Sequence, residues 1–343
     1  MTLSVEGFAD RAELERFLVG APIYYQPWWL EAVSPGAWDY AIVRRGSEIA
    51  AVMPFVRSKC GFGKTRIRMP PLTHTLGPWL RPSENSHLEQ LAEQNELMLE
   101  LIDSLPEYDA FNQAFHYSVT NWLPFYWKGF TQRTRYTYVL QDLEDLDAVW
   151  KEFDPDIRWN IRRAKSRVEV VEDFDFDTFL KVRSMSFTRQ GIEPTHTGEL
   201  LRRVDAACES HKARKMFFAV DASHNIHAVA YIVWTNYAAY YILGGGNTDL
   251  RGSGANCLVI WEAIRFSRSV TRSFDFEMAL QSEPIERFFR LFGGRLMPYF
   301  KVRKFVPFCD ACSWFRHRVV HRINLPLYKR FVARAGRWLH RTA

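Results

Sequence analysis

The order of predicted elements is nearly the same in the two halves of this 343-residue chain, and this repetition limits the folds open to it. Each half reads as three strands, a helix, a strand, a short helix and a last strand, judged from the spacing of apolar residues. In the first half these segments are 38–44, 49–57, 67–76, 86–105, 109–117, 122–130 and 132–140. In the second half they are 216–220, 226–235, 237–243, 257–269, 274–277, 284–292 and 296–302. The pattern predicts an α/β (α+β) protein of two similar units, each a mixed, mostly antiparallel sheet flanked by helices.

The repetition places the boundary between the units near Leu143–Trp150. Two predicted helices, at 150–165 and 176–189, open the second unit. We therefore expect domains at 1–145 and 146–308, followed by a tail at 309–343. The length agrees with two domains, because a single domain commonly has about 150 residues.

The composition is that of a globular, intracellular protein. Hydrophobic residues make up 47% and charged residues 24%, which excludes disorder as the main state. Glu6, Asp10, Glu13 and Glu15 interrupt the first twenty residues, so we expect no secretory signal. Five cysteines, mostly scattered, are typical of a reducing compartment. These features predict a cytoplasmic protein.

The net charge of +6 comes from the tail. Residues 311–343 contain eight Lys or Arg and no acidic residue, which leaves 37 basic and 39 acidic residues in the rest of the chain. A nucleic-acid-binding body would normally carry a basic face of its own, so the near-neutral body argues against this function. The tail alternates apolar and basic residues on both sides of Pro326, a pattern typical of two short amphipathic helices. Such helices would place the protein on the inner face of an anionic membrane, or pack on the body.

One uncharged stretch, Ala228–Thr248, has the 21 residues needed to span a bilayer. It is rich in β-branched and aromatic residues, Thr235 and Asn236 interrupt it, and three glycines lie near its end. These features favour two strands joined by a tight turn over a membrane-spanning helix.

The segment Asp249–Asn256 connects a predicted strand to a predicted helix and contains Gly252 and Gly254. Glycines at such a junction let backbone N–H groups converge, and the helix N-terminus and Arg251 add positive charge, so a pyrophosphate could bind here. The alternative is a plain glycine turn. Neither a Walker loop nor a dinucleotide-binding fingerprint is present, since no Gly-Lys-Ser/Thr follows and the third glycine is missing.

The order of the elements around this loop resembles the GCN5-related N-acyltransferase (GNAT) superfamily, and Arg251–Asn256 resembles its acyl-CoA signature, with Asn256 where a small residue is usual. The segments 70–78, 156–165, 273–277 and 283–294 are similar to the double-domain branch related to the Fem-type peptidyl transferases and to acyltransferases of polysaccharide gene clusters. The resemblance extends over about residues 20–305 and implies tandem GNAT-like domains.

This resemblance implies that the second half binds acetyl-CoA or another acyl-CoA. The residues expected to contact this donor are Tyr241, Leu243, Arg251, Gly252, Ser253, Gly254, Ala255 and Asn256. The first half has Gly77–Pro82 at the matching point, and its prolines lack N–H donors. The first half is therefore a degenerate, acceptor-side unit that should not hold CoA.

Transfer of an acyl group to an amine requires a base for the amine proton and an acid for the leaving thiolate. Glu277 ends a predicted strand where the resemblance places the acyl carbonyl, and we interpret it as the general base, acting directly or through water. Tyr299 is a candidate proton donor, and His74 a candidate substrate contact or alternative base. The alternatives are a solvated or salt-bridged carboxylate, a core tyrosine and a structural histidine.

Candidate acceptor-binding residues lie in both halves. Thr73 belongs to the proline-rich segment that faces the expected acceptor cleft, and Trp29 could stack on a sugar ring or be part of the core. Arg158 and Arg162 share a helical face that could bind an acidic acceptor or simply be solvated. Asp275 shares a strand face with Glu277.

These features together predict an acyl-CoA-dependent N-acyltransferase that modifies an amino sugar or another surface-polysaccharide precursor, either a small molecule or lipid-linked. The alternatives are a peptidyl transferase that uses aminoacyl-tRNA, the one case in which nucleic acid would bind, and a non-catalytic membrane- or partner-binding protein. We expect no metal, since Cys309 and Cys312 have no second pair and His317 and His321 have no carboxylate nearby.

Overall fold

The structure of the protein is a computed structural model of the 343-residue chain. It describes all residues except 1–7, 60–62, 173, 191–195, 278–282 and 306–343. The predicted tail at 309–343, with Cys309, Cys312, His317 and His321, lies outside the described residues, so its binding to a membrane stays a prediction.

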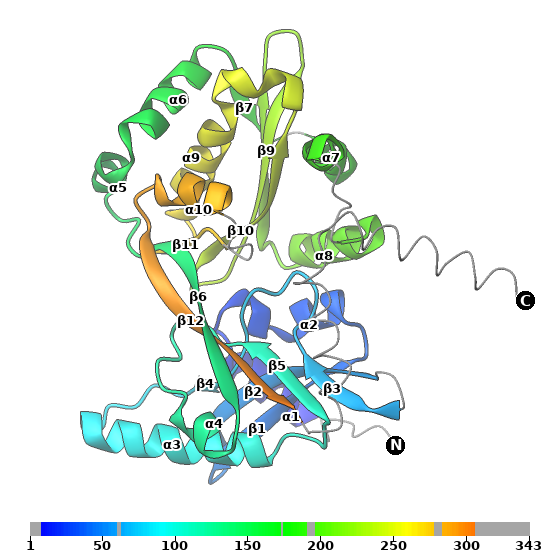
Figure 1. The fold of residues 1–343 in the computed structure, drawn as a ribbon, viewed down its shortest axis with the longest axis vertical. Coiled ribbons are helices and arrows are strands. Elements are labelled where there is room, and N and C mark those ends of the chain that lie inside the picture. Colours follow the sequence, from blue (N-terminus) through cyan, green and yellow to red (C-terminus); the bar gives the residue numbers. More distant parts are fainter. Residues whose placement is uncertain (1–7, 60–62, 173, 191–195, 278–282, 306–343) are drawn as a thin grey trace, which may run out of the picture.

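A single twelve-stranded mixed sheet runs through the chain, in the order β1-β2-β3-β5-β12-β6-β11-β10-β9-β8-β7, with β4 paired to β2 (Figure 1). The strands are β1 (Trp38–Arg45), β2 (Glu48–Lys59), β3 (Thr65–Arg68), β4 (Trp79–Leu80), β5 (Ala110–Ala114), β6 (Thr131–Leu140), β7 (Glu169–Val171), β8 (Arg214–Val220), β9 (Ile226–Trp234), β10 (Ala239–Gly246), β11 (Phe274–Asp275) and β12 (Arg295–Phe305). The sheet is mostly antiparallel, and helices flank it, as the sequence predicted.

Helices cover both faces of this sheet. They are α1 (Phe8–Phe17), α2 (Pro27–Val33), α3 (His87–Asp103), α4 (Leu123–Trp127), α5 (Leu146–Glu152), α6 (Pro155–Lys165), α7 (Phe176–Gln190), α8 (Gly198–Ser210), α9 (Ala255–Ser267) and α10 (Glu283–Arg290), with 3-10 turns η1 (Ile23–Tyr25) and η3 (Thr248–Ser253). In the first half, α3 and α4 pack on a core that includes Phe111, Phe125 and Val302. In the second half, α7 and α9 contact β9 and β10, and α2 packs on α8.

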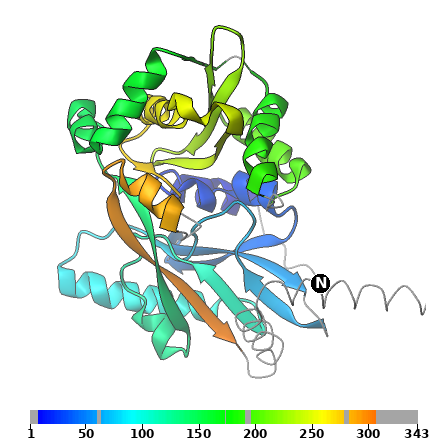
Figure 2. The ribbon, with the colours of Figure 1, turned by 45° about the horizontal axis from the view of Figure 1, so that its top comes forward.

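The last strand, β12, returns from the second half to the first. It pairs antiparallel with β5 along Lys301–Phe305 and with β6 along Arg295–Arg303. Figures 1 and 2 show β6 and β12 running side by side from one half of the molecule into the other. The sheet therefore continues past the predicted boundary near residue 145, and one strand of the second half completes the sheet of the first.

The repeated order of elements recurs in the structure, with three local differences. The helix expected at 150–165 is two helices, α5 and α6, because Asp154 caps a new helix whose first residue is Pro155. The strand expected at 67–76 ends at Arg68, since the Pro70–Pro71 pair provides no N–H donors and Leu72 has a positive φ of 52°. Helix α8, which the sequence analysis did not identify, begins at a side-chain cap from Thr197.

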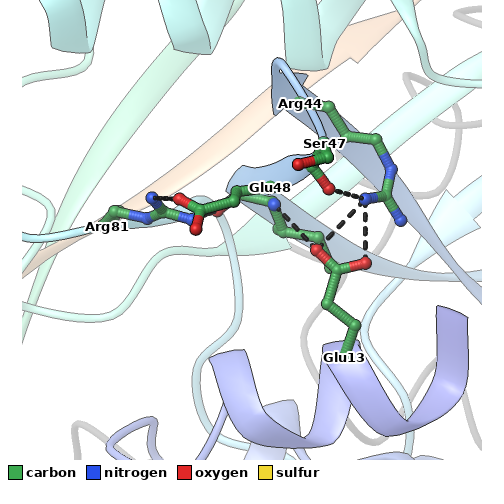
Figure 3. Close-up of polar contacts among 6 residues, drawn as sticks. Glu13, Arg44, Ser47, Glu48 and Arg81 are labelled. Atoms are coloured by element: carbon green, nitrogen blue, oxygen red, sulfur yellow. Dashed lines mark hydrogen bonds and ion pairs between the residues drawn. The ribbon is translucent and has the colours of Figure 1, made fainter.

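Charged groups fix α1 to the first hairpin of the sheet (Figure 3). The Glu13 carboxylate accepts hydrogen bonds from the Arg44 guanidinium at 2.8 Å and from the backbone N–H of Ile49 at 3.0 Å. Arg44 also donates to the carbonyl of Ser47 in the turn. These contacts tie the helix to the turn between β1 and β2.

The uncharged stretch 228–248 forms most of β9, all of β10 and the tight turn between them, as predicted. Within the described part of the chain, no helix has both the length and the apolar character required to cross a membrane.

A reciprocal pair of hydrogen bonds begins α3, and this supplies a test of the fold. The Ser86 hydroxyl accepts from the Glu89 N–H, while the Glu89 carboxylate accepts from the Ser86 N–H at 3.0 Å. We expect Ser86→Ala to lower the free energy of unfolding by about 1 kcal/mol, because helix donors lose their acceptor. Ser86→Asn should retain most of the stability, since Asn also caps. Urea unfolding of both variants checks this; equal losses would show that the cap contributes nothing.

Candidate active site

The candidate site lies where β10 and β11 separate. The two strands pair in parallel over only two positions, Ala239 with Phe274 and Tyr240 with Asp275, although β10 continues to Gly246. A register shift between Tyr241 and Leu243 bends β10 at this point. Glu277 lies two residues after the end of β11, close to the point at which the two strands diverge.

Three residues that the sequence analysis selected lie in contact here. His74 Nδ1 is 3.0 Å from the Glu277 carboxylate, and His74 Nε2 is 3.0 Å from the Tyr299 hydroxyl. The side chains of His74 and Glu277 are only 3% and 9% exposed, so this pair is largely shielded from solvent. The three residues come from the first half, the end of β11 and β12, and the fold brings them together between the two halves.

Asp275 positions Glu277. Its Oδ1 accepts a hydrogen bond of 2.6 Å from the Thr137 hydroxyl on β6 and one of 2.8 Å from the backbone N–H of Glu277. Glu277 itself has a φ of 53°, a left-handed conformation that costs a non-glycine residue about 1–2 kcal/mol. The hydrogen bond to Asp275 holds the backbone in this conformation and directs the Glu277 carboxylate toward His74.

Burial and charge set the protonation states of these groups. Burial, the largest single effect, lowers the pKa of His74, but the charge and hydrogen bonding of Glu277 together with the charge of Asp275 outweigh it, so the pKa of His74 is raised. Burial, followed by the charge of Glu277, raises the pKa of Asp275 to about 7. Burial and the Glu277 charge also raise the pKa of Tyr299 and, more strongly, that of Tyr24. The raised pKa values of His74 and Tyr299 favour a protonated imidazole beside a neutral phenol.

The predicted donor loop has a built-in packing constraint. Gly254 has a φ of 82°, and a Cβ there would lie 2.5 Å from the carbonyl oxygen of Asn160 in α6. The loop therefore packs directly against the α6 backbone, and Gly254 serves this close approach. Ser253 is buried, and its hydroxyl accepts from the Ala255 N–H at 3.3 Å, so it caps α9.

Other parts of the loop are open. Arg251 and Gly252 are exposed, and a Cβ on Gly252 would meet no atom within 4 Å. Asn256 is exposed, and its amide oxygen lies near Gly246 on β10. Arg167, which follows α6, approaches the loop and donates to the Gly252 carbonyl at 3.4 Å. An anion at this loop would thus meet the start of α9 and two arginines.

Tyr241 and Leu243 line β10 beyond its pairing with β11. Leu243 is buried, and the Tyr241 ring packs against Phe289 of α10 with ring centroids 5.9 Å apart. The Tyr241 hydroxyl lies over Gly244, where a Cβ would collide with it. Both residues therefore border the separation of β10 from β11.

The predicted acceptor residues have structural partners instead. Trp29 is fully buried and donates its indole N–H to the Thr73 hydroxyl at 3.0 Å, so its ring has no exposed face on which a sugar could stack. Arg158 donates to the carbonyls of Lys151 and Phe153, and Arg162 lies 5.7 Å from the centroid of the Trp150 ring. Both arginines belong to α6 and contact α5 or the residue that follows it, so they link these two helices.

A hollow of about 880 Å³ lies elsewhere, between α9, β7 and the end of α6. Three of its charged residues pair with one another: Lys165 and Arg265 both contact Glu262, at 3.8 and 2.6 Å. It contains none of the His74 group. We therefore do not place chemistry there.

Comparison with known proteins agrees with this geometry. A family model described as the acetyltransferase (GNAT) domain matches residues 133–284. The crystal structure of FemX is similar, with 13% identity, a TM-score of 0.64, and coverage of 84% of this chain and 95% of that chain. The C-terminal domain of a putative lysylphosphatidylglycerol synthetase from Agrobacterium fabrum has 13% identity, a TM-score of 0.52, and coverage of 91% and 96%. A conserved protein of unknown function from Bacteroides thetaiotaomicron has 11% identity, a TM-score of 0.52, and coverage of 86% and 96%. No curated protein matches the sequence.

Residues 133–284 thus match the family model of a GNAT domain, and the chain as a whole has a fold similar to that of FemX. The resemblance inferred from the sequence is confirmed. The GNAT fold is an acyltransferase fold, and it does not by itself specify the acyl donor or the acceptor.

Sequence reasoning missed Thr137 and the positioning role of Asp275. Thr137 lies within β6, and only the strand order, which places β6 beside β11, brings its hydroxyl to Asp275. No local motif marks it. For Asp275, the alternation along the strand predicted that its side chain and that of Glu277 share a face. It did not predict the hydrogen bond that the Glu277 backbone N–H donates to Asp275 Oδ1.

The raised pKa of Asp275 predicts a pH-dependent stability. The folded state holds this proton more tightly than the unfolded state, so the stability that wild type has below pH 4 is lost as the pH rises toward 7. Asp275→Asn can keep both hydrogen bonds, because both are donated to Oδ1. We expect the stability of this variant relative to wild type to rise by about 2–4 kcal/mol between pH 4 and pH 8. Urea unfolding across this range measures it; a constant difference would contradict the assignment.

Proposed function

We propose that this protein transfers an acyl group, acetyl as the simplest case, from acyl-CoA to an amine on an amino sugar or another surface-polysaccharide precursor. The observation that carries the proposal is His74 in contact with both Glu277 and Tyr299 where β10 and β11 diverge. This arrangement puts a carboxylate base and a phenolic acid on two sides of one imidazole. The loop that follows β10, with Arg251 and Gly252 exposed, is suited to a pyrophosphate.

The proton steps follow from the geometry. Glu277 takes the proton that the acceptor amine loses as it attacks the thioester carbonyl. Tyr299 gives its proton to the departing sulfur, and the protonated His74 replaces it through Nε2. Nδ1 keeps its own proton beside Glu277 throughout. After the product leaves, Glu277 releases its proton to solvent and Nε2 of His74 takes one from solvent, so the site returns to its starting charge. Acyl-CoA, when bound, supplies the activated thioester.

Removing the base should separate chemistry from donor binding. We expect Glu277→Gln to lower kcat by about 10²–10⁴-fold, because a typical general base contributes that much. The Kd for acetyl-CoA should stay within about twofold. Steady-state kinetics with a panel of amino-sugar acceptors, together with calorimetry, would measure both. Wild-type turnover between pH 6 and 9 would show that Glu277 is not the base, and His74→Gln and Tyr299→Phe would then be compared.

The donor loop can be tested at Gly252 without disturbing packing. Gly254→Asp would break the contact with Asn160, so its effect could not be assigned to the phosphates. Gly252→Asp adds a carboxylate in open space and should weaken acetyl-CoA binding at least tenfold by repulsion. Gly252→Ala is the matched control and should bind like wild type. Calorimetry should show one acetyl-CoA site per wild-type chain. If Gly252→Asp binds acetyl-CoA with unchanged affinity, the loop is not the donor site.

A donor other than acyl-CoA gives a different result in the same experiment. If the protein released no CoA from acetyl-CoA with any acceptor but formed product from charged tRNA, it would be a peptidyl transferase. The proposal would then be wrong in its donor and acceptor.

A further inference from the structure

A row of positive charges leads away from the His74 group along β6 and β12. We define the cationic row as Arg133 on β6 and Lys301 and Arg303 on β12. Lys301 lies opposite Arg133 in the register, and Arg303 lies opposite Thr131. Tyr299 is two residues from Lys301 and four from Arg303, so the three side chains share one face of β12. His74 contacts Tyr299, and therefore the row and the site lie on the same face of the sheet.

These charges are not neutralised by acidic neighbours. None of the ion pairs within the described ranges of the chain involves Arg133, Lys301 or Arg303. Burial lowers the pKa of both Lys301 and Arg303, and the neighbouring charges that lower it further are all positive. Half-buried cations that repel one another cost folding free energy, so an anionic ligand would relieve a cost that the fold otherwise carries.

The spacing suits a group attached close to the reacting amine. At a rise of about 3.3 Å per residue, Lys301 lies about 7 Å and Arg303 about 13 Å along the strand from Tyr299. This interval is comparable to one or two sugar-sized units. Lys301 and Arg303 are half-buried on β12, so a flat membrane surface or a broad nucleic acid would reach these two residues less readily than a small anion.

We propose that the cationic row binds a phosphate or diphosphate group of a water-soluble acceptor and thereby presents the acceptor amine to Glu277. The inference rests on the proposed function for the position of the amine. It differs from the sequence-based expectation that Arg158 and Arg162 bind an acidic acceptor; those two side chains contact Lys151 and Trp150 of α5.

The test uses inorganic pyrophosphate as the probe, isothermal titration calorimetry, and the full chain saturated with CoA, so that the donor loop is already occupied and does not bind the probe. Wild type should bind pyrophosphate, and Lys301→Gln/Arg303→Gln should bind it at least tenfold more weakly. The matched control is Arg268→Gln/Arg272→Gln, which removes the same charge from two exposed arginines near the end of α9 and should stay within twofold of wild type. Equal affinity in the two double variants, or no binding to wild type, would overturn the proposal.

Three further measurements keep the result interpretable. If the β12 variant unfolds, the exposed Arg133→Gln replaces it, with an expected loss of at least threefold. Vesicles of anionic lipid and total tRNA are tested against the same variants; binding of either that depends on the row, without pyrophosphate binding, would contradict a small phosphorylated acceptor. The affinity for acetyl-CoA should be the same in wild type and in all of these variants. A wrong assignment of the cationic row would therefore change the pyrophosphate result alone, and a wrong assignment of the donor would change the acetyl-CoA result alone.

Discussion

The pairing of β6 with β12 is the interaction on which the rest of the structure depends. It joins nine residue pairs, from Arg295 with Val139 to Arg303 with Thr131. The two strands bring β5 of the first half and β11 of the second half into one sheet. The same pairing places Tyr299 opposite Arg135 and Met297 opposite Thr137. The site is therefore assembled by backbone register, and a shift of one residue would turn Tyr299 and Thr137 to the opposite face.

A buried group of acids and bases requires mutual compensation. An isolated carboxylate in the interior costs several kcal/mol, which is why buried ionisable groups are paired or lose their charge. Here Glu277 has His74 at 3.0 Å, and Asp275 has two hydrogen-bond donors and a raised pKa. Two carboxyl groups, one imidazole and one phenol can then share charge and protons in a space from which water is largely absent. Charges interact most strongly in such a buried environment, so small changes in the positions of these groups have their largest effect on the pKa values there.

The sequence predicted local features well and pairings between distant segments poorly. Apolar spacing gave the order of elements, and it placed the start of α3 within one residue of His87, because these features depend on neighbours in the chain. Glu277, Tyr299 and His74 could be selected from their places at strand ends and in a motif, and the structure brings them together. Their catalytic roles stay predictions. The contact of Gly254 with Asn160 and the burial of Trp29 could not be read from the sequence, because both depend on the packing of segments far apart in the chain.

The order in which the chain is synthesised gives the return of β12 a further meaning. His74, Thr137 and Glu277 are all made before residue 299, yet the group is incomplete until Tyr299 is in place. Until then β5 and β6 have no strand between them, and the facing edges of both carry unpaired backbone donors and acceptors. A nascent or truncated chain would thus be inactive and, at the same time, open to pairing with other strands. Completion of the sheet and completion of the site are one event in the folding of this molecule.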